Sequence, residues 1–179
     1  IFLWLIIISC VWAVHGKKRH QWFAIAMSVA AILADILDFF LKNAVTSWVS
    51  KITIVFFLGY AVVSILFYLI SQEEVTADMM MAGASEYILI GILWACFYIL
   101  IEAAYPGSFN LNFTGVKMDR SEFLYFSFVT LTTTGYGDVL PVSVQARSLA
   151  MLEMITGQLF IAMTVARLVS LYTVRGNKH

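Results

Sequence analysis

The chain has 179 residues, of which 61% are hydrophobic and only 12% are charged, about half the charged fraction of an ordinary soluble domain. Eleven basic residues balance eleven acidic residues, so no overall charge favours nucleic acid or an acidic substrate as a partner. This composition excludes a water-soluble globular domain and predicts an all-α integral membrane protein embedded in the lipid bilayer.

The first 78 residues are expected to hold about three membrane passes, since about 20 apolar residues cross the hydrocarbon core of a bilayer. The apolar run at 1–16 begins without a methionine, and we interpret it as the latter part of a truncated helix rather than a signal peptide. A basic turn at 16–20 precedes the second pass at 21–41, and the third pass is expected at 52–70. A polar, acidic linker follows at 71–78.

Residues 79–179 have the layout of a pore domain, with two long helices around a short helix and a loop. Apolar runs predict an outer helix at 84–104 and an inner helix at 143–174. The stretch at 121–132 is also helical in pattern, with Ser121 as its expected N-cap. Twelve residues reach only about 18 Å, so this pore helix is expected to enter the membrane and leave by the same side.

The pore helix leads into the segment Thr-Thr-Thr-Gly-Tyr-Gly-Asp at 132–138, in which glycine recurs at alternate positions. A dehydrated monovalent cation needs a cage of oxygens, and backbone carbonyls form one when successive residues turn them the same way. L-residues resist that geometry, so Gly135 and Gly137 are suited to it. Thr133 adds a hydroxyl at the inner end, and the pore helix directs the negative end of its dipole toward the cation.

Residues 133–138, Thr-Thr-Gly-Tyr-Gly-Asp, resemble the Thr-Val-Gly-Tyr-Gly-Asp selectivity filter of tetrameric potassium channels, members of the pore-loop cation channel superfamily. The likeness covers about 84–174 and includes Gly157, at the spacing where simple bacterial potassium channels have a hinge glycine in the inner helix. The resemblance implies that five filter residues bind the ion: Thr133, Thr134, Gly135, Tyr136 and Gly137. It further implies that K⁺ is held by the first four of these, and that Asp138 lies at the outer mouth.

The same resemblance implies a passive, potassium-selective channel that assembles as a homotetramer in the cell membrane, of the kind found in the bacterial plasma membrane. It implies no enzymatic activity and no cofactor other than bound K⁺. Two departures leave a weakly selective cation channel open: Thr134 replaces the usual valine, and Val129 stands where some potassium channels have a glutamate bonded to the outer aspartate. A non-conducting partner subunit is a further alternative. A membrane enzyme is disfavoured because no HExxH or GxSxG motif occurs.

Two further residues are hypothesised to support the filter. Without the glutamate, Tyr125 is the candidate partner for Asp138. Glu153 lies ten residues into the inner helix and is expected to bond Thr130 or Thr132 and so brace the filter, unless its carboxyl has no effect on conduction. Below Gly157, residues at helical spacing are expected to line a cavity and form a gate, although helix packing explains the same spacing. They are Gln158, Ile161, Val165 and Val169.

Orientation follows from the filter, which faces outward in potassium channels. Counting passes backward then places 71–78 in the cytoplasm, 43–51 outside and the basic residues at 16–20 inside, as the positive-inside rule expects. The pass at 52–70 contains no lysine or arginine. Because the membrane field then has little charge to act on, the sequence excludes an arginine-based voltage sensor in that helix.

Overall fold

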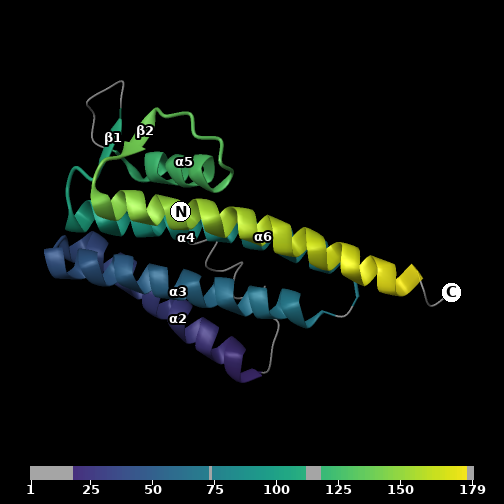
Figure 1. Cartoon of the computed structure of the whole chain (residues 1–179). Coiled ribbons are helices and arrows are strands. Elements are labelled where there is room, and N and C mark those ends of the chain that lie inside the picture. Colours follow the sequence, from purple (N-terminus) through teal and green to yellow (C-terminus); the bar gives the residue numbers. More distant parts are fainter. Residues whose placement is uncertain (1–17, 73, 112–117, 177–179) are drawn as a thin grey trace. The chain divides into compact units, whose positions relative to one another are not determined.

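The computed structural model describes residues 18–72, 74–111 and 118–176 (Figure 1). The first expected pass, at 1–16, lies outside these residues. The chain divides into two compact units, Ile1–Gln72 and Glu73–His179. Four helices in the described part are long and apolar enough to cross a membrane: Trp22–Leu41, Ala44–Ser71, Ala77–Ala104 and Val144–Leu171. The protein is therefore an all-α, multi-pass membrane protein.

The first unit is a helical hairpin of α2 (Lys18–Leu41) and α3 (Ala44–Ser71). The third pass was expected to begin at 52, but α3 begins directly after Asn43. The Thr46 hydroxyl accepts a hydrogen bond from the Asn43 backbone N–H at 3.3 Å, so polar residues that resemble a loop cap a helix instead. α3 still contains no arginine, and Lys51 is its one lysine.

Carboxyl groups of α2 bond to hydroxyl groups of α3 across this hairpin. Ser50 Oγ donates to Asp35 Oδ1 at 3.3 Å, and Thr46 Oγ1 donates to Asp38 Oδ1 at 3.1 Å. Polar groups inside a membrane are stable only when they are bonded, so these contacts fix the pairing of the two helices.

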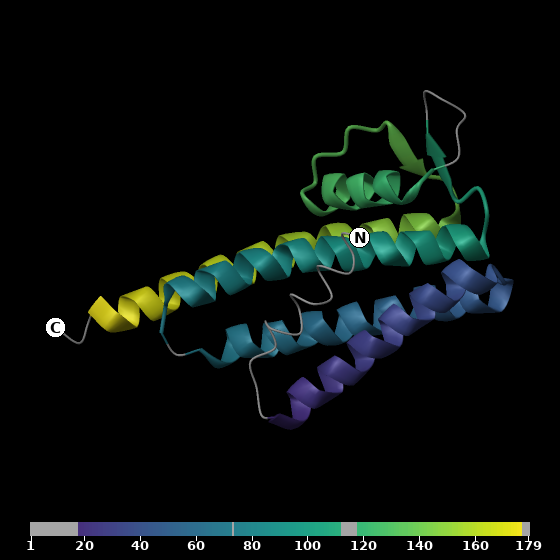
Figure 2. The same ribbon diagram turned by 180° about the vertical axis from the view of Figure 1, so that it is seen from behind.

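The second unit consists of α4 (Ala77–Ala104), α5 (Arg120–Leu131) and α6 (Val144–Gly176), with two short strands. α4 and α6 pack along each other, and α5 packs against both, as Figures 1 and 2 show. α4 begins earlier than 84 because the Thr76 hydroxyl accepts a bond from Met79 N at 3.1 Å and caps the helix. The cap of α5 is Asp119 rather than Ser121, since Asp119 Oδ1 accepts from the backbone N–H groups of Ser121 and Glu122.

The strands β1 (Phe109–Leu111) and β2 (Val139–Pro141) form an antiparallel pair in which Asn110 lies opposite Leu140. The pair joins the loop after α4 to the segment that follows residue 138. Next to it lies the main buried cluster of the unit, in which Phe109 makes edge-to-face contacts with Tyr98, Phe123 and Phe126. Each such aromatic pair contributes about 0.5–1.5 kcal/mol beyond its buried area, so the cluster holds α5 firmly against α4.

Candidate functional site

The segment between α5 and β2 has an alternating backbone. Thr133, Gly135 and Gly137 have positive φ angles of 57°, 60° and 79°, whereas Thr134 and Tyr136 do not. A β-branched residue at positive φ is a genuine outlier, and such strain gathers at functional sites. Alternation of left-handed and right-handed residues lets successive peptide groups share one orientation, which is the backbone that a row of carbonyl ligands requires.

Hydrogen bonds fix the direction of the first peptide groups in this segment. The N–H of Thr133 donates to Thr130 O at 2.9 Å, and the N–H groups of Thr134 and Gly135 donate to Val129 O at 2.9 and 3.3 Å. None of the described peptide bonds is cis, and in a trans peptide the C=O points opposite to the N–H. Because these three N–H groups face the end of α5, the carbonyls of residues 132, 133 and 134 point away from it.

The three threonine side chains divide between the two faces of the segment. Thr132 Oγ1 donates to Phe128 O at 2.7 Å, which keeps this hydroxyl against α5. Thr132 Oγ1 lies 2.8 Å from Thr134 Oγ1, so the extra hydroxyl of Thr134 is satisfied behind the segment. Within the described residues, the Thr133 hydroxyl makes no hydrogen bond and remains able to act as a ligand.

The C-terminal end of the segment is tied to α5 through Asp138. Tyr125 Oη donates to Asp138 Oδ2 at 2.6 Å, the partner that the sequence suggested for this carboxylate in place of a residue at 129. The other carboxylate oxygen accepts from Val139 N at 3.0 Å. The Tyr136 ring lies parallel to the Tyr125 ring with centroids 6.5 Å apart, and Tyr136 is 71% exposed. Tyr136 therefore leans on α5 and leaves most of its surface uncovered in a single chain.

We expect the Tyr125–Asp138 bond to persist across the physiological pH range. The bond from Tyr125 holds the pKa of Asp138 below its ordinary value, and the bond to Asp138 raises the pKa of Tyr125 to about 12. The stabilisation by Asp138 is therefore present above its ordinary pKa of about 3.9 and is lost only as pH falls through the lowered value. The stabilisation by the Tyr125 hydroxyl is lost only as pH rises toward about 12.

Tyr125→Phe should move acid inhibition of ion flux to a higher pH, because the pKa of Asp138 then rises toward its ordinary value. The measurement is flux through reconstituted protein as the pH is lowered from 7 to 3. Tyr105→Phe is the matched control, since Tyr105 is exposed and its hydroxyl lies outside this bond. Identical titration curves for Tyr125→Phe and the control would show that the bond does not govern the pH dependence of flux.

Glu153 is completely buried, but its predicted partners were wrong. Its carboxyl contacts Tyr98 Oη of α4 and Ser127 Oγ of α5 rather than Thr130 or Thr132. α6 packs so that Glu153 faces the middle of α5, one turn before the predicted position. Neither Tyr98 nor Ser127 was predicted to be a partner of Glu153. A tyrosine in an apolar helix needs a partner for its hydroxyl, and that signal was available at Tyr98.

Gly157 lies at the closest approach of α6 to the end of α5. A Cβ atom added to Gly157 would lie 2.4 Å from Leu131 O and 3.0 Å from Leu131 Cδ1. Leu131 O also accepts a hydrogen bond from Tyr87 Oη at 3.2 Å. The structure thus gives Gly157 a packing role, and the expected hinge remains a prediction. Residues Gln158, Ile161, Val165 and Val169 are all exposed in the single chain.

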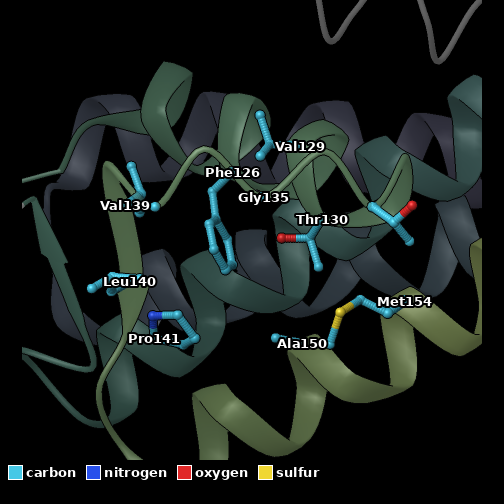
Figure 3. Close-up of a pocket in the computed structure, with 11 residues that line it drawn as sticks. Phe126, Val129, Thr130, Gly135, Val139, Leu140, Pro141, Ala150 and Met154 are labelled. Carbon is cyan, nitrogen blue, oxygen red and sulfur yellow. The ribbon is translucent and has the colours of Figure 1, made fainter.

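A cavity of about 240 Å³ lies between the filter segment and the helices that face it. In Figure 3, Phe126, Val129 and Thr130 of α5 and Ala150 and Met154 of α6 line it together with β2. This cavity separates the filter segment from α6. The position of the segment is therefore fixed by the bonds to α5 described above.

Comparisons with known proteins identify this region. Residues 87–174 match the family model described as ion channel, and this range runs from α4 through α5 and the filter segment into α6. The potassium channel protein kcv of Paramecium bursaria Chlorella virus 1 is 27% identical over 85 residues, which are 45% of this chain and 89% of that protein. No solved structure matches the chain significantly. The family match and the viral relative together support a pore-loop domain of the ion channel family at residues 87–174 of this multi-pass membrane protein.

Proposed function

We propose that the chain is one subunit of a homotetrameric potassium channel that conducts K⁺ passively through the filter at 133–138. The observation that carries the proposal is the direction of the filter amides. Their N–H groups bond to Val129 O and Thr130 O, so that the carbonyls of residues 132–134 face away from α5. A row of carbonyls facing one side is a ligand set for a dehydrated monovalent cation.

In this proposal the ion sites are formed by the carbonyls of residues 133–136 and by the Thr133 hydroxyl. Thr133 is suited to this role because its hydroxyl makes no bond to another described residue. One chain supplies oxygens from one side only, whereas a bound K⁺ must be surrounded. Four copies around one axis complete each cage, as in other channels with this filter motif.

The exposed face of α6 fits the same assembly. Ile161, Val165 and Val169 are 43%, 53% and 58% exposed in the single chain, although they are apolar. With Gln158 they lie below the filter at helical spacing, where a tetramer has its central cavity. We propose that these four residues line that cavity and that the lower valines close it by excluding water. Gly157 belongs to the same helix and permits its contact with α5.

We further propose that the protein lies in the cell membrane with Asp138 at the external mouth and that membrane voltage does not gate it through an arginine sensor. α3 supports the second point, since its only basic residue is Lys51, near its N-terminal end.

The proposal is tested by ion flux through purified protein in liposomes. A potassium gradient should drive a current that barium blocks, and the reversal potential should follow K⁺ rather than Na⁺. Protein with Thr133–Asp138 replaced by a Gly-Ser linker of equal length is the control and should pass no current. Equal K⁺ and Na⁺ permeability would favour the second candidate, a weakly selective cation channel. The observation that favours this candidate is the Thr132–Thr134 hydroxyl pair behind the filter. Absence of any flux would favour a non-conducting partner subunit.

A further inference from the structure

A buried polar cluster joins the three helices of the second unit. It consists of the Tyr98 hydroxyl and the Gly91 carbonyl of α4, the Ser127 hydroxyl of α5 and the Glu153 carboxyl of α6. Tyr98, Ser127 and Glu153 each have 0% exposure, and they lie among apolar residues at membrane depth. The family resemblance assigns no role to this cluster, and none of its residues belongs to the filter.

The hydrogen-bonding capacity of Ser127 determines the state of Glu153. Ser127 Oγ lies 2.7 Å from Gly91 O and 2.5 Å from Glu153 Oε1, but a hydroxyl has only one hydrogen to donate. The Gly91 carbonyl can only accept, so both contacts are hydrogen bonds only when Ser127 donates to Gly91 O and Glu153 supplies the second hydrogen. The contact between Ser127 Oγ and Glu153 Oε1 is then a hydrogen bond only if Glu153 Oε1 carries a proton.

The remaining contacts agree with this assignment. Tyr98 Oη donates to Glu153 Oε2, so a neutral Glu153 leaves every polar atom of the cluster bonded. An ionised Glu153 would lack a cation, because no lysine or arginine of the described residues pairs with it. The other titratable group nearby, Tyr87 of α4, donates its hydroxyl to Leu131 O. An unpaired charge buried among apolar residues is strongly unfavourable.

We propose that Glu153 is a neutral carboxylic acid that locks α5 to α4 and α6 and thereby positions the filter. Glu153 affects the position of the filter through two successive sets of contacts. Glu153 and Gly91 hold Ser127 in the middle of α5, and the same helix presents Val129 O and Thr130 O, which bind the N–H groups of the first filter residues. Glu153 is a positioning residue, and its effect on conduction rests on the proposed channel function.

The charge state is tested by infrared spectroscopy, which does not depend on conduction. The difference spectrum of the wild type and Glu153→Gln in bilayers at pH 7 should contain the C=O band of a protonated carboxylic acid and no carboxylate band. Glu86→Gln is the matched control, since Glu86 is also fully buried but its carboxyl oxygens make no hydrogen bond to the described residues. The Glu86 band should lie at higher frequency than the hydrogen-bonded Glu153 band. Loss of carboxylate bands in Glu153→Gln would overturn the proposal.

The positioning role is tested by the K⁺-over-Na⁺ flux ratio. The amide introduced by Glu153→Gln can donate to Ser127 and accept from Tyr98, so this variant should keep the ratio within about twofold of the wild type from pH 5 to 9. Glu153→Leu fills similar space without these bonds and should lower the ratio about tenfold, as the loss of buried hydrogen bonds implies. Ser127→Ala, which removes only one hydroxyl, should lower it in the same direction and serves if the leucine variant does not fold.

The outcomes distinguish the role of Glu153 from the channel function itself. A ratio that falls as far in Glu153→Gln as in Glu153→Leu would overturn the neutral lock, and so would an unchanged ratio in Glu153→Leu and Ser127→Ala. Absence of K⁺ flux in the wild type would instead reject the proposed channel function, while the infrared result would still decide the charge of Glu153.

Discussion

Gly157→Ala is expected to abolish potassium flux and to lower the thermal stability of the protein. The added Cβ would lie 2.4 Å from the backbone oxygen of Leu131, closer than real Cβ contacts allow, and 3.0 Å from its side chain. Leu131 O cannot retreat freely, because the Tyr87 hydroxyl is bonded to it. α5 or α6 must therefore shift, and overpacking of this kind costs about 1–3 kcal/mol or more per chain. Any movement of α5 also moves Val129 O and Thr130 O, which hold the filter amides.

Two other glycines of the same unit provide graded controls for Gly157→Ala. A Cβ at Gly83 would meet only Thr164 Cγ2 at 3.8 Å, so Gly83→Ala should leave flux and melting temperature unchanged. A Cβ at Gly91 would lie 2.8 Å from the Phe128 ring, which can rotate, so Gly91→Ala should have an intermediate effect. Flux through reconstituted protein and the melting temperature distinguish the three variants. Equal behaviour of Gly157→Ala and Gly83→Ala would show that the close contact is unimportant.

Within the described residues, the four long helices could be predicted from apolar runs, but the starts of two of them could not. α3 and α4 begin at Ala44 and Ala77, before the expected 52 and 84, and their first turns mix apolar residues with polar ones, Thr46 and Ser47 in α3 and Asp78 in α4. Hydropathy reads such turns as loops, whereas Thr46 and Thr76 use their hydroxyls to satisfy backbone N–H groups there. The strands β1 and β2 were not predicted, since three residues are too few to produce a periodic pattern.

Local motifs predicted the candidate site better than distant contacts did. The filter motif pointed to residues 133–138, and helical spacing placed Tyr125 near Asp138, where the structure has a hydrogen bond. The partner of Glu153 depends on how α6 is turned against α5, and a shift of one turn separates the expected Thr130 from the observed Ser127. Tyr98 lies on a third helix. No spacing rule within one segment links residues that only the packing of three helices brings together.

Gly137→Ala is expected to reduce potassium flux at least a hundredfold. Gly137 has a φ of 79°, and no atom lies within 4 Å of a Cβ added there, so the effect is conformational rather than steric. An L-residue in the left-handed region costs about 1–2 kcal/mol, which amounts to roughly 4–8 kcal/mol in the proposed tetramer. The chain relieves that strain by turning the peptide group, which removes carbonyls from the row that faces the ion.

Gly107→Ala separates this effect from backbone strain in general. Gly107 has a φ of 84°, and a Cβ there also meets no atom within 4 Å, but the residue lies in an exposed turn after α4. Both variants should lose similar thermal stability per chain, whereas only Gly137→Ala should lose K⁺ flux and K⁺-over-Na⁺ selectivity. If the two variants conducted equally well, the alternating backbone at 133–137 would not be the ion path. A row of carbonyl ligands would be disrupted by an alanine at Gly137, whereas an exposed turn accepts an alanine at Gly107 without any effect on conduction.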